Sequence, residues 1–200
     1  MLTPEKARAE LTLAAGMNPG PWEGHSLSVA ENARLIAEKA GLDSERAYVF
    51  GLLHDIGRRA GVKGIAHIFD GYDYLTEMGE PEAARICLTH SFPLQDADTF
   101  VGKYDCTSEQ KEFLAGFLKS CDYDDYARLI QLCDAVSLPG GACIMEKRLV
   151  DVALRHGLPA FTLDKWRAFL EIKKHFDALC GYSIYDFLPN VLENSSADLI

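Results

Sequence analysis

The sequence predicts an all-α fold, a compact single domain of about eight to ten helices, and three observations support this prediction. Apolar residues recur at spacings of three and four along most of the chain, as on the buried face of a helix. No segment combines sustained alternation with enrichment in β-branched residues, as a strand would. Glycine and proline stand between the periodic segments, where they end one helix before the next begins.

The first two helices are indicated by a cap and by an apolar stripe. Thr3 suits the N-cap and Pro4 the first turn, so a helix is predicted over residues 3–15. After a break rich in glycine and proline, a second helix is predicted over residues 22–40. His25 shares the apolar face of that second helix, so its side chain should point into the protein.

The third helix leads into the pair His54-Asp55. Asp43 can cap this helix, and His54 lies on the stripe of its apolar residues. The preceding residues Leu52 and Leu53 mark the segment as buried. Burying a carboxylate beside an imidazole costs several kcal/mol unless a partner neutralises both, and a divalent cation is the simplest such partner.

The middle of the chain adds two more histidines that should face inward. Helices are predicted over residues 66–78 and 81–90, and His67 and His90 lie on their apolar faces. Residues 91–107 show no clear period. Because an irregular connection of this length is more often functional than not, we expect it to border the site.

The second half of the chain is also predicted to be helical. On the second of its helices Asp134 places a carboxylate on an apolar face. The predicted helices span residues 108–120, 122–136, 142–156 and 163–180. The residues available for packing on the last helix are Leu163, Trp166, Leu170 and Phe176.

Composition limits the classes of partner. The formal net charge of -10 argues against a nucleic-acid polymer as partner, since proteins that bind one usually present a basic stripe. The first residues lack the features of a signal peptide, and no apolar run is long enough to span a membrane. The six cysteines form no Cys-x-x-Cys pair, so we expect reduced thiols in a cytoplasmic protein.

Four polar residues interrupt otherwise apolar faces, namely His25, His54, Asp55 and Asp134. A single histidine in such a place is usually a hydrogen-bonded core residue. Two imidazoles and two carboxylates together are a ligand set for Mn, Fe, Co, Ni or Zn, and they leave room on the ion for water or substrate. The sequence therefore predicts a site for a divalent transition metal.

The segments around these residues are Trp22–Ser26 (WEGHS), Leu52–Gly57 (LLHDIG) and Cys133–Ala135 (CDA). In their order along the chain and in their residues, these segments resemble the HD superfamily of metal-dependent phosphohydrolases, whose name comes from the His-Asp pair. The resemblance spans residues 22 to about 137, and it implies a helical domain with the four residues binding a metal at its centre. The expected division is a leader helix and linker at 1–21, the HD domain with its C-terminal packing helices at 22–190, and a tail at 191–200.

His67 and His90 resemble the additional histidines of two-metal members of that superfamily. The resemblance then implies that Asp55 bridges the two ions and that the added histidines hold the second. The alternative is that both histidines line the pocket and bond phosphate.

Arg58, Arg59 and Lys63 form a positive cluster in the loop predicted over residues 57–64, just beyond the His-Asp pair. They could clamp phosphate oxygens, or they could belong to a solvated loop. Arg148 and Lys147 are further candidates. Their position in an acidic chain suits a small phosphorylated substrate.

The leading functional hypothesis is hydrolysis of a small phosphate ester or anhydride, most plausibly of a nucleotide, by a metal-activated water. The residues expected to carry this chemistry are His54, Asp55, Asp134 and Arg58. Two alternatives remain open. One is an oxygenase that holds two irons and uses dioxygen, and the other is a non-catalytic module that binds a ligand.

Overall fold

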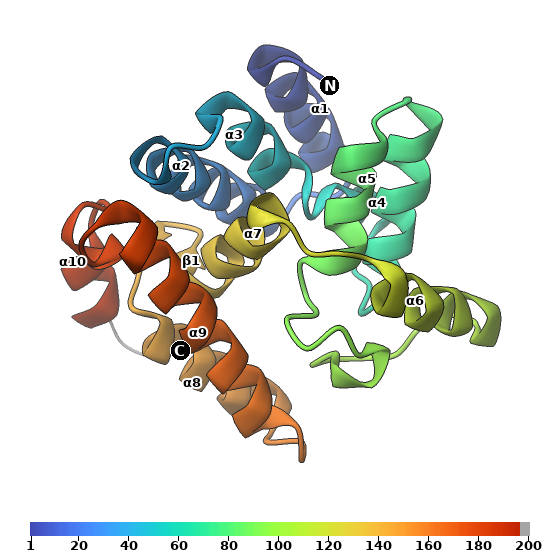
Figure 1. Ribbon diagram of the computed structural model, residues 1–200. Coiled ribbons are helices and arrows are strands. Elements are labelled where there is room, and N and C mark those ends of the chain that lie inside the picture. Colours follow the sequence, from blue (N-terminus) through green and yellow to red (C-terminus); the bar gives the residue numbers. More distant parts are fainter. Residues whose placement is uncertain (197–200) are drawn as a thin grey trace.

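The computed structural model describes residues 1–196, and this part of the chain is helical almost throughout, as predicted (Figure 1). The α-helices are α1 (Pro4–Met17), α2 (Trp22–Ala40), α3 (Ser44–Leu53), α4 (Ala66–Glu77), α5 (Pro81–Thr89), α6 (Ser108–Ser120), α7 (Asp125–Val136), α8 (Met145–His156), α9 (Thr162–Cys180) and α10 (Val191–Ser196). Short 3-10 helices are η1 (Ile56–Ala60), η2 (Ala97–Thr99) and η3 (Ile184–Asp186). No helix within this part of the chain is both long and apolar enough to cross a bilayer.

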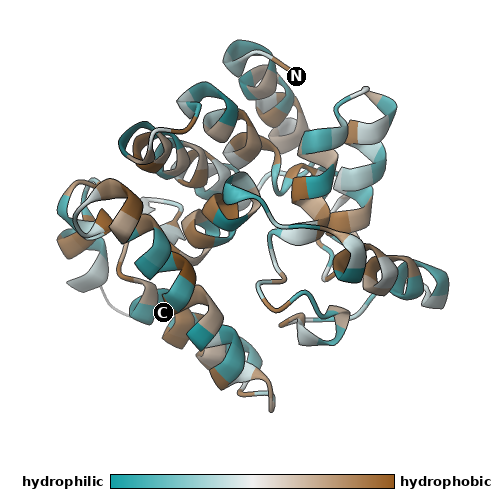
Figure 2. Cartoon of the chain, in the orientation of Figure 1, coloured by the Kyte–Doolittle hydropathy of each residue, from teal (hydrophilic) through white to brown (hydrophobic). Residues whose placement is uncertain are grey.

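Helix α7 lies at the centre of the molecule, where α2, α3, α5, α8 and α9 pack around it (Figure 1). The larger hydrophobic core is formed by this group together with α1. A smaller second core lies between α4, α5, α6 and the irregular segment before α6. Figure 2 shows hydrophilic and hydrophobic residues alternating along the ribbons of peripheral helices such as α6 and α9.

Segment 57–64, expected to be a loop, instead begins within η1. Helix α3 ends at Leu53, with His54 as its C-cap, and the chain tightens into the 3-10 helix after Asp55. This turn rests on α4, because a Cβ added at Gly57 would lie only 1.9 Å from the carbonyl oxygen of His67. The short helix is therefore held in place by close backbone packing.

Helix α8 begins at Met145 rather than at residue 142, because a short antiparallel ribbon precedes it. Its strands are β1 (Ser137–Leu138) and β2 (Gly141–Ala142). Gly141 has a φ of 128°, in the left-handed region that favours glycine. Strands of two residues are too short to give a periodic signal in the sequence.

Helix α9 buries only part of the stripe expected: Phe176 is buried and Trp166 is partly buried against the core, whereas the two leucines are exposed. Leu163 and Leu170 are 60% and 43% exposed. The buried stripe instead contains Lys165, Phe169 and Phe176, with Ile172 between the last two. Both stripes have helical spacing, so periodicity does not separate them, and the lysine makes the buried one look polar.

The first part of the expected tail is ordered as α10, which packs on the ribbon. The Asn194 amide donates to the carbonyl of Ala142 at 2.8 Å, and the backbone N–H of Ile144 donates to Ser195 Oγ at 2.9 Å. The sequence gives no sign of this packing, because the hydrogen-bond partners of these polar side chains lie about fifty residues away. Residues 197–200 of the expected tail lie outside the described part.

Candidate metal centre

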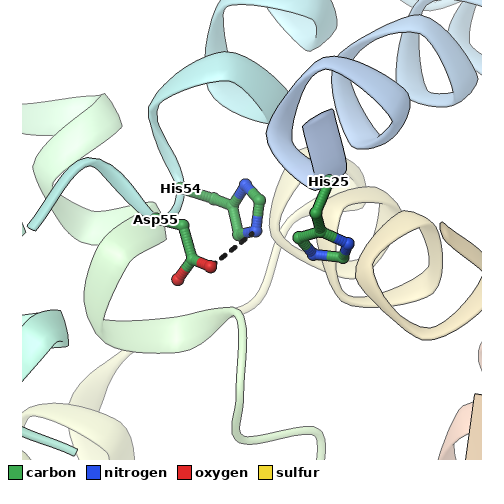
Figure 3. A group of neighbouring side chains, drawn as sticks. All are labelled: His25, His54 and Asp55. Carbon is green, nitrogen blue, oxygen red and sulfur yellow. Dashed lines mark ion pairs between the residues drawn. The ribbon is translucent and has the colours of Figure 1, made fainter. Parts of the chain in front are cut away.

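Side chains from five separate segments converge beside the junction of α3 and η1. Figure 3 shows His25 of α2 beside His54 and Asp55. The ring centroids of His25 and His54 are 5.5 Å apart. His90 lies at the end of α5 with its ring 5.1 Å from that of His54, and His67 of α4 lies 5.7 Å beyond it. The structure thus brings together histidines that lie up to 65 positions apart in the sequence.

Backbone carbonyls determine which ring nitrogen carries the proton in three of these histidines. The Nδ1–H of His54 donates to Gly51 at 2.7 Å, and that of His90 donates to Cys87 at 2.9 Å. His67 makes the corresponding bond to Gly64. A carbonyl oxygen can only accept, so in each neutral ring Nε2 is left with a free lone pair. This is the tautomer that binds a metal through Nε2.

Several acceptor atoms at this point are buried without a hydrogen-bond partner. They are His54 Nε2, His67 Nε2 and Asp55 Oδ1. His67 Nε2 lies 3.1 Å from Asp55 Oδ1. In the neutral ring both of these atoms are acceptors, so a cation between them would satisfy both. The donor set of imidazole nitrogen and carboxylate oxygen therefore fits a divalent transition metal.

The ligand atoms form two groups that share Asp55. One group is His25, His54 and Asp55, and the other is Asp55, His67 and His90, with the ligand atoms of each group within 4.8 Å of one another. Asp55 Oδ1 faces the second group, since it lies 3.6 Å from His90 Nε2, whereas Oδ2 lies 3.8 Å from His54 Nε2. A carboxylate with one oxygen toward each group is suited to bridging two ions.

Asp134 joins this arrangement through His25. Its Oδ1 lies 2.9 Å from His25 Nε2, and the carboxylate is partly exposed to the adjoining cavity. It is not a member of either group of converging ligand atoms. Of the four residues that the sequence singled out, three thus share one group and the fourth contacts it.

The charges of the site suit metal binding. Burial by itself would raise the pKa of Asp55, but the Arg58 guanidinium and two imidazole rings outweigh burial and hold this pKa well below its usual range. Arg58 Nε donates to Asp55 Oδ2 at 2.5 Å. Burial also acts to raise the pKa of Asp134, and the hydrogen bond with His25 outweighs it. Burial lowers the pKa of His90 to about 3, so its ring is neutral near pH 7.

A cavity of about 490 Å³ opens beside the ligands. Segment 91–107 borders it, as expected, through Ser91, Phe100 and Val101. The far wall comes from the β1 region, α8 and α9. The cationic residues that line the cavity are Arg58, Arg148, Arg155 and Lys165.

Only one member of the predicted positive cluster faces this cavity. The Arg59 guanidinium lies 3.8 Å from the centroid of the Tyr74 ring, and Lys63 pairs with Asp70 at 2.7 Å. Arg58 points into the site because a 3-10 helix turns successive side chains by about 120°.

The sequence did not lead us to Lys165, which lines the cavity and is buried. It lies four residues before Phe169 and seven before Ile172, and both of these are buried. Its helical spacing from these apolar residues was the signal in the sequence that could have predicted its burial. Arg155 was missed too, and nothing in its local sequence pointed to the cavity.

Comparison with protein families places these residues in context. A family model described as HD domain matches residues 22–138. This segment contains all six candidate metal ligands and ends in β1. No curated protein and no solved structure matched the chain.

Proposed function

This chain belongs to the HD-domain family, and from that premise we propose that it is a metal-dependent phosphohydrolase acting on a small phosphate ester or anhydride. Nucleotides are the substrates we expect. The observation that carries the proposal is the set of buried acceptor atoms without partners around Asp55. Such atoms destabilise a folded protein unless a ligand satisfies them.

The two groups of ligand atoms support a proposal for the residues that would hold metal. His25, His54 and Asp55 would hold one ion, with Asp134 beside them as a further candidate ligand, and His67 and His90 would hold a second that shares Asp55. When bound, divalent cations supply Lewis acidity toward a phosphoryl oxygen and make a water acidic enough to act as nucleophile.

The remaining chemistry belongs to the chain itself. The Nε of Arg58 anchors Asp55, while the terminal nitrogens of its guanidinium are available to bind phosphoryl oxygens in the cavity. Asp134 is ionised and faces the cavity, so it can accept a hydrogen bond from an attacking water and orient it. The apolar part of the wall, which includes Trp166 and Phe169, can hold the body of the substrate.

The character of the cavity and chain supports a small anionic substrate. Four cationic side chains and three aspartates line the cavity, and Arg148 and Arg155 both pair with Asp151, so Lys165 and the terminal nitrogens of Arg58 are left to meet an anion. The whole chain carries a net charge of -10, which disfavours a nucleic-acid polymer. This lining also favours hydrolysis over an oxygenase that would hold two irons in the same ligands. The six cysteines are free, which supports our proposal of a cytoplasmic location.

The test combines metal content with turnover. We expect about two metal ions per chain in the purified protein, and phosphate release from a nucleotide panel after loading with Mn, Fe, Co, Ni or Zn. H54A and D55A should lose turnover while they remain folded, and H67A should retain about one ion. H175A is the matched control, since His175 contacts Asp125 at 3.0 Å, outside the site.

Three outcomes separate this proposal from its alternatives. Absence of phosphate release with every metal would overturn the hydrolase proposal. Oxygen uptake together with a mixed-valent di-iron signal would indicate an oxygenase. A metal-free protein that binds a nucleotide without cleaving it would indicate a non-catalytic module.

A further inference from the structure

Lys165 of α9 is a buried lysine that lines the same cavity as the metal ligands. It is 8% exposed. It lies beyond the segment that matches the HD-domain model, which ends at residue 138. Lysine is rarely buried to this extent unless a partner offsets the cost of removing its charge from water.

Two backbone carbonyls hold the ammonium group. Lys165 Nζ donates to the carbonyl of Ser91 at 2.9 Å and to that of Thr99 at 2.8 Å. Ser91 follows the metal-ligand candidate His90 directly, and Thr99 belongs to η2. Lys165 therefore joins α9 to the start and the middle of segment 91–107, which borders the cavity.

These contacts leave one donor unused, and the positive charge is offset only through space, by the Asp134 carboxylate. An ammonium group has three N–H donors, and two are given to the carbonyls. None of the ion pairs found within residues 1–196 includes Lys165. Burial lowers its pKa to about 8, which still leaves most of the ammonium protonated near pH 7.

We propose that Lys165 donates its third N–H to a phosphoryl oxygen of the substrate, so that α9 supplies an anion-binding group that completes the site. The identity of the anion rests on the function proposed above. An incoming phosphoryl group would provide the direct ionic contact that the ammonium does not have with any residue in 1–196, where Asp134 acts on it only through space. Because Lys165 needs a negatively charged acceptor, we expect the site to prefer substrates whose phosphoryl group has a free, charged oxygen next to the metal ligands.

A purely structural role is the competing explanation, because Lys165 also ties segment 91–107 to α9. Two substitutions separate the roles. Lys165→Gln keeps two amide N–H donors for the carbonyls, although it is one methylene shorter, and removes the charge and the third donor. Lys165→Met is an unbranched side chain of the same length as the glutamine, and it removes the charge and every donor.

The experiment measures binding of inorganic phosphate to metal-loaded protein by calorimetry, with the metal content of each variant determined in parallel. We expect K165Q to weaken phosphate binding by about 10- to 100-fold, with unchanged metal content. The control is K173Q on the same helix. Lys173 is also mostly buried but pairs with Asp177 at 2.6 Å, so its substitution should leave phosphate affinity unchanged.

Each result decides the question. Phosphate affinity in K165Q within twofold of the wild-type value would overturn the inference, and so would loss of metal from K165Q, since Lys165 would then only position His90. If K165Q does not fold, K165M decides by the same criterion.

Nucleotide hydrolysis combined with phosphate binding that does not depend on Lys165 would refute this inference alone. Phosphate binding that depends on Lys165, without hydrolysis of any nucleotide, would refute the hydrolase proposal alone.

Discussion

At the scale of single residues, hydrogen bonds at helix ends determine what the metal centre can bind. His54 and His90 are the C-caps of α3 and α5, and each donates Nδ1–H to a carbonyl three residues earlier. The last carbonyls of a helix have no intrahelical partner and are free to accept. Ending a helix at each histidine therefore also leaves Nε2 free to bind a metal.

Burial of Lys165 should make the stability of the protein depend on alkaline pH. Its pKa is about 8 in the folded protein, compared with about 10.4 in an unfolded chain. Between these values the unfolded state binds more protons, so the contribution of Lys165 to the free energy of unfolding rises with pH. Relative to K165M, the wild-type protein should gain up to about 3 kcal/mol between pH 7.5 and 10.5.

Denaturant unfolding of chelator-treated protein at several pH values measures this difference. K165M lacks the titrating group but keeps all the others. The difference in stability between the two proteins therefore isolates the contribution of Lys165. A difference between the two proteins that stays constant over this range would contradict the expectation.

At the scale of elements, two glycines let helices approach closely enough to bring the ligands together. A Cβ at Gly51 of α3 would lie 2.4 Å from the Cα of Ala30 in α2, so these helices touch through their backbones. A Cβ at Gly57 would meet α4 in the same way. The first contact places His25 beside His54, and the second places Asp55 beside His67.

Gly51→Ala should therefore disturb both stability and the metal centre. The added methyl group meets backbone atoms that cannot rotate away, so α2 and α3 must separate, at a cost of about 1–3 kcal/mol. Gly116→Ala is the control, because Gly116 is exposed in α6 and an added Cβ there has no atom within 4 Å. It should raise stability by about 0.5–1 kcal/mol. Chemical denaturation and metal content check both, and equal effects would refute the role given to close packing.

At the scale of the whole molecule, the N-terminal helix is part of the main core although it precedes the segment that matches the family model. Leu11 of α1 is 1% exposed and lies in the main hydrophobic cluster. The Asn18 amide, just after α1, donates to the carbonyl of Arg58 at 2.7 Å. Helix α1 thus supports η1, which follows the His-Asp pair. The division into a leader at 1–21 and a domain at 22–190 stays a prediction.

Leu11→Ala should destabilise the protein by about 2–5 kcal/mol, because it removes buried methyl groups and leaves a cavity in the main core. Leu13→Ala on the same helix should have little effect, since Leu13 is 57% exposed. Denaturant unfolding of the two variants tests whether α1 is integral to the fold. Equal stabilities would show that it is not.

The sequence by itself determined the helical fold, most helix positions and the residue types of the candidate metal centre. These features depend on caps, glycine breaks and helical spacing, which act between residues close together in the chain. The inward direction of His25 and His54 followed from the same local periodicity.

The tertiary structure alone decided which side chains share a space. Periodicity gives the direction of a side chain about its own helix, and it leaves open how each helix is rotated against its neighbours. For this reason α9 buries Lys165 rather than Leu163, and Arg58 reaches the cavity whereas Arg59 does not. The sharing of Asp55 between two ligand groups likewise depends on how closely α3, η1 and α4 approach one another, and this distance is set by long-range packing.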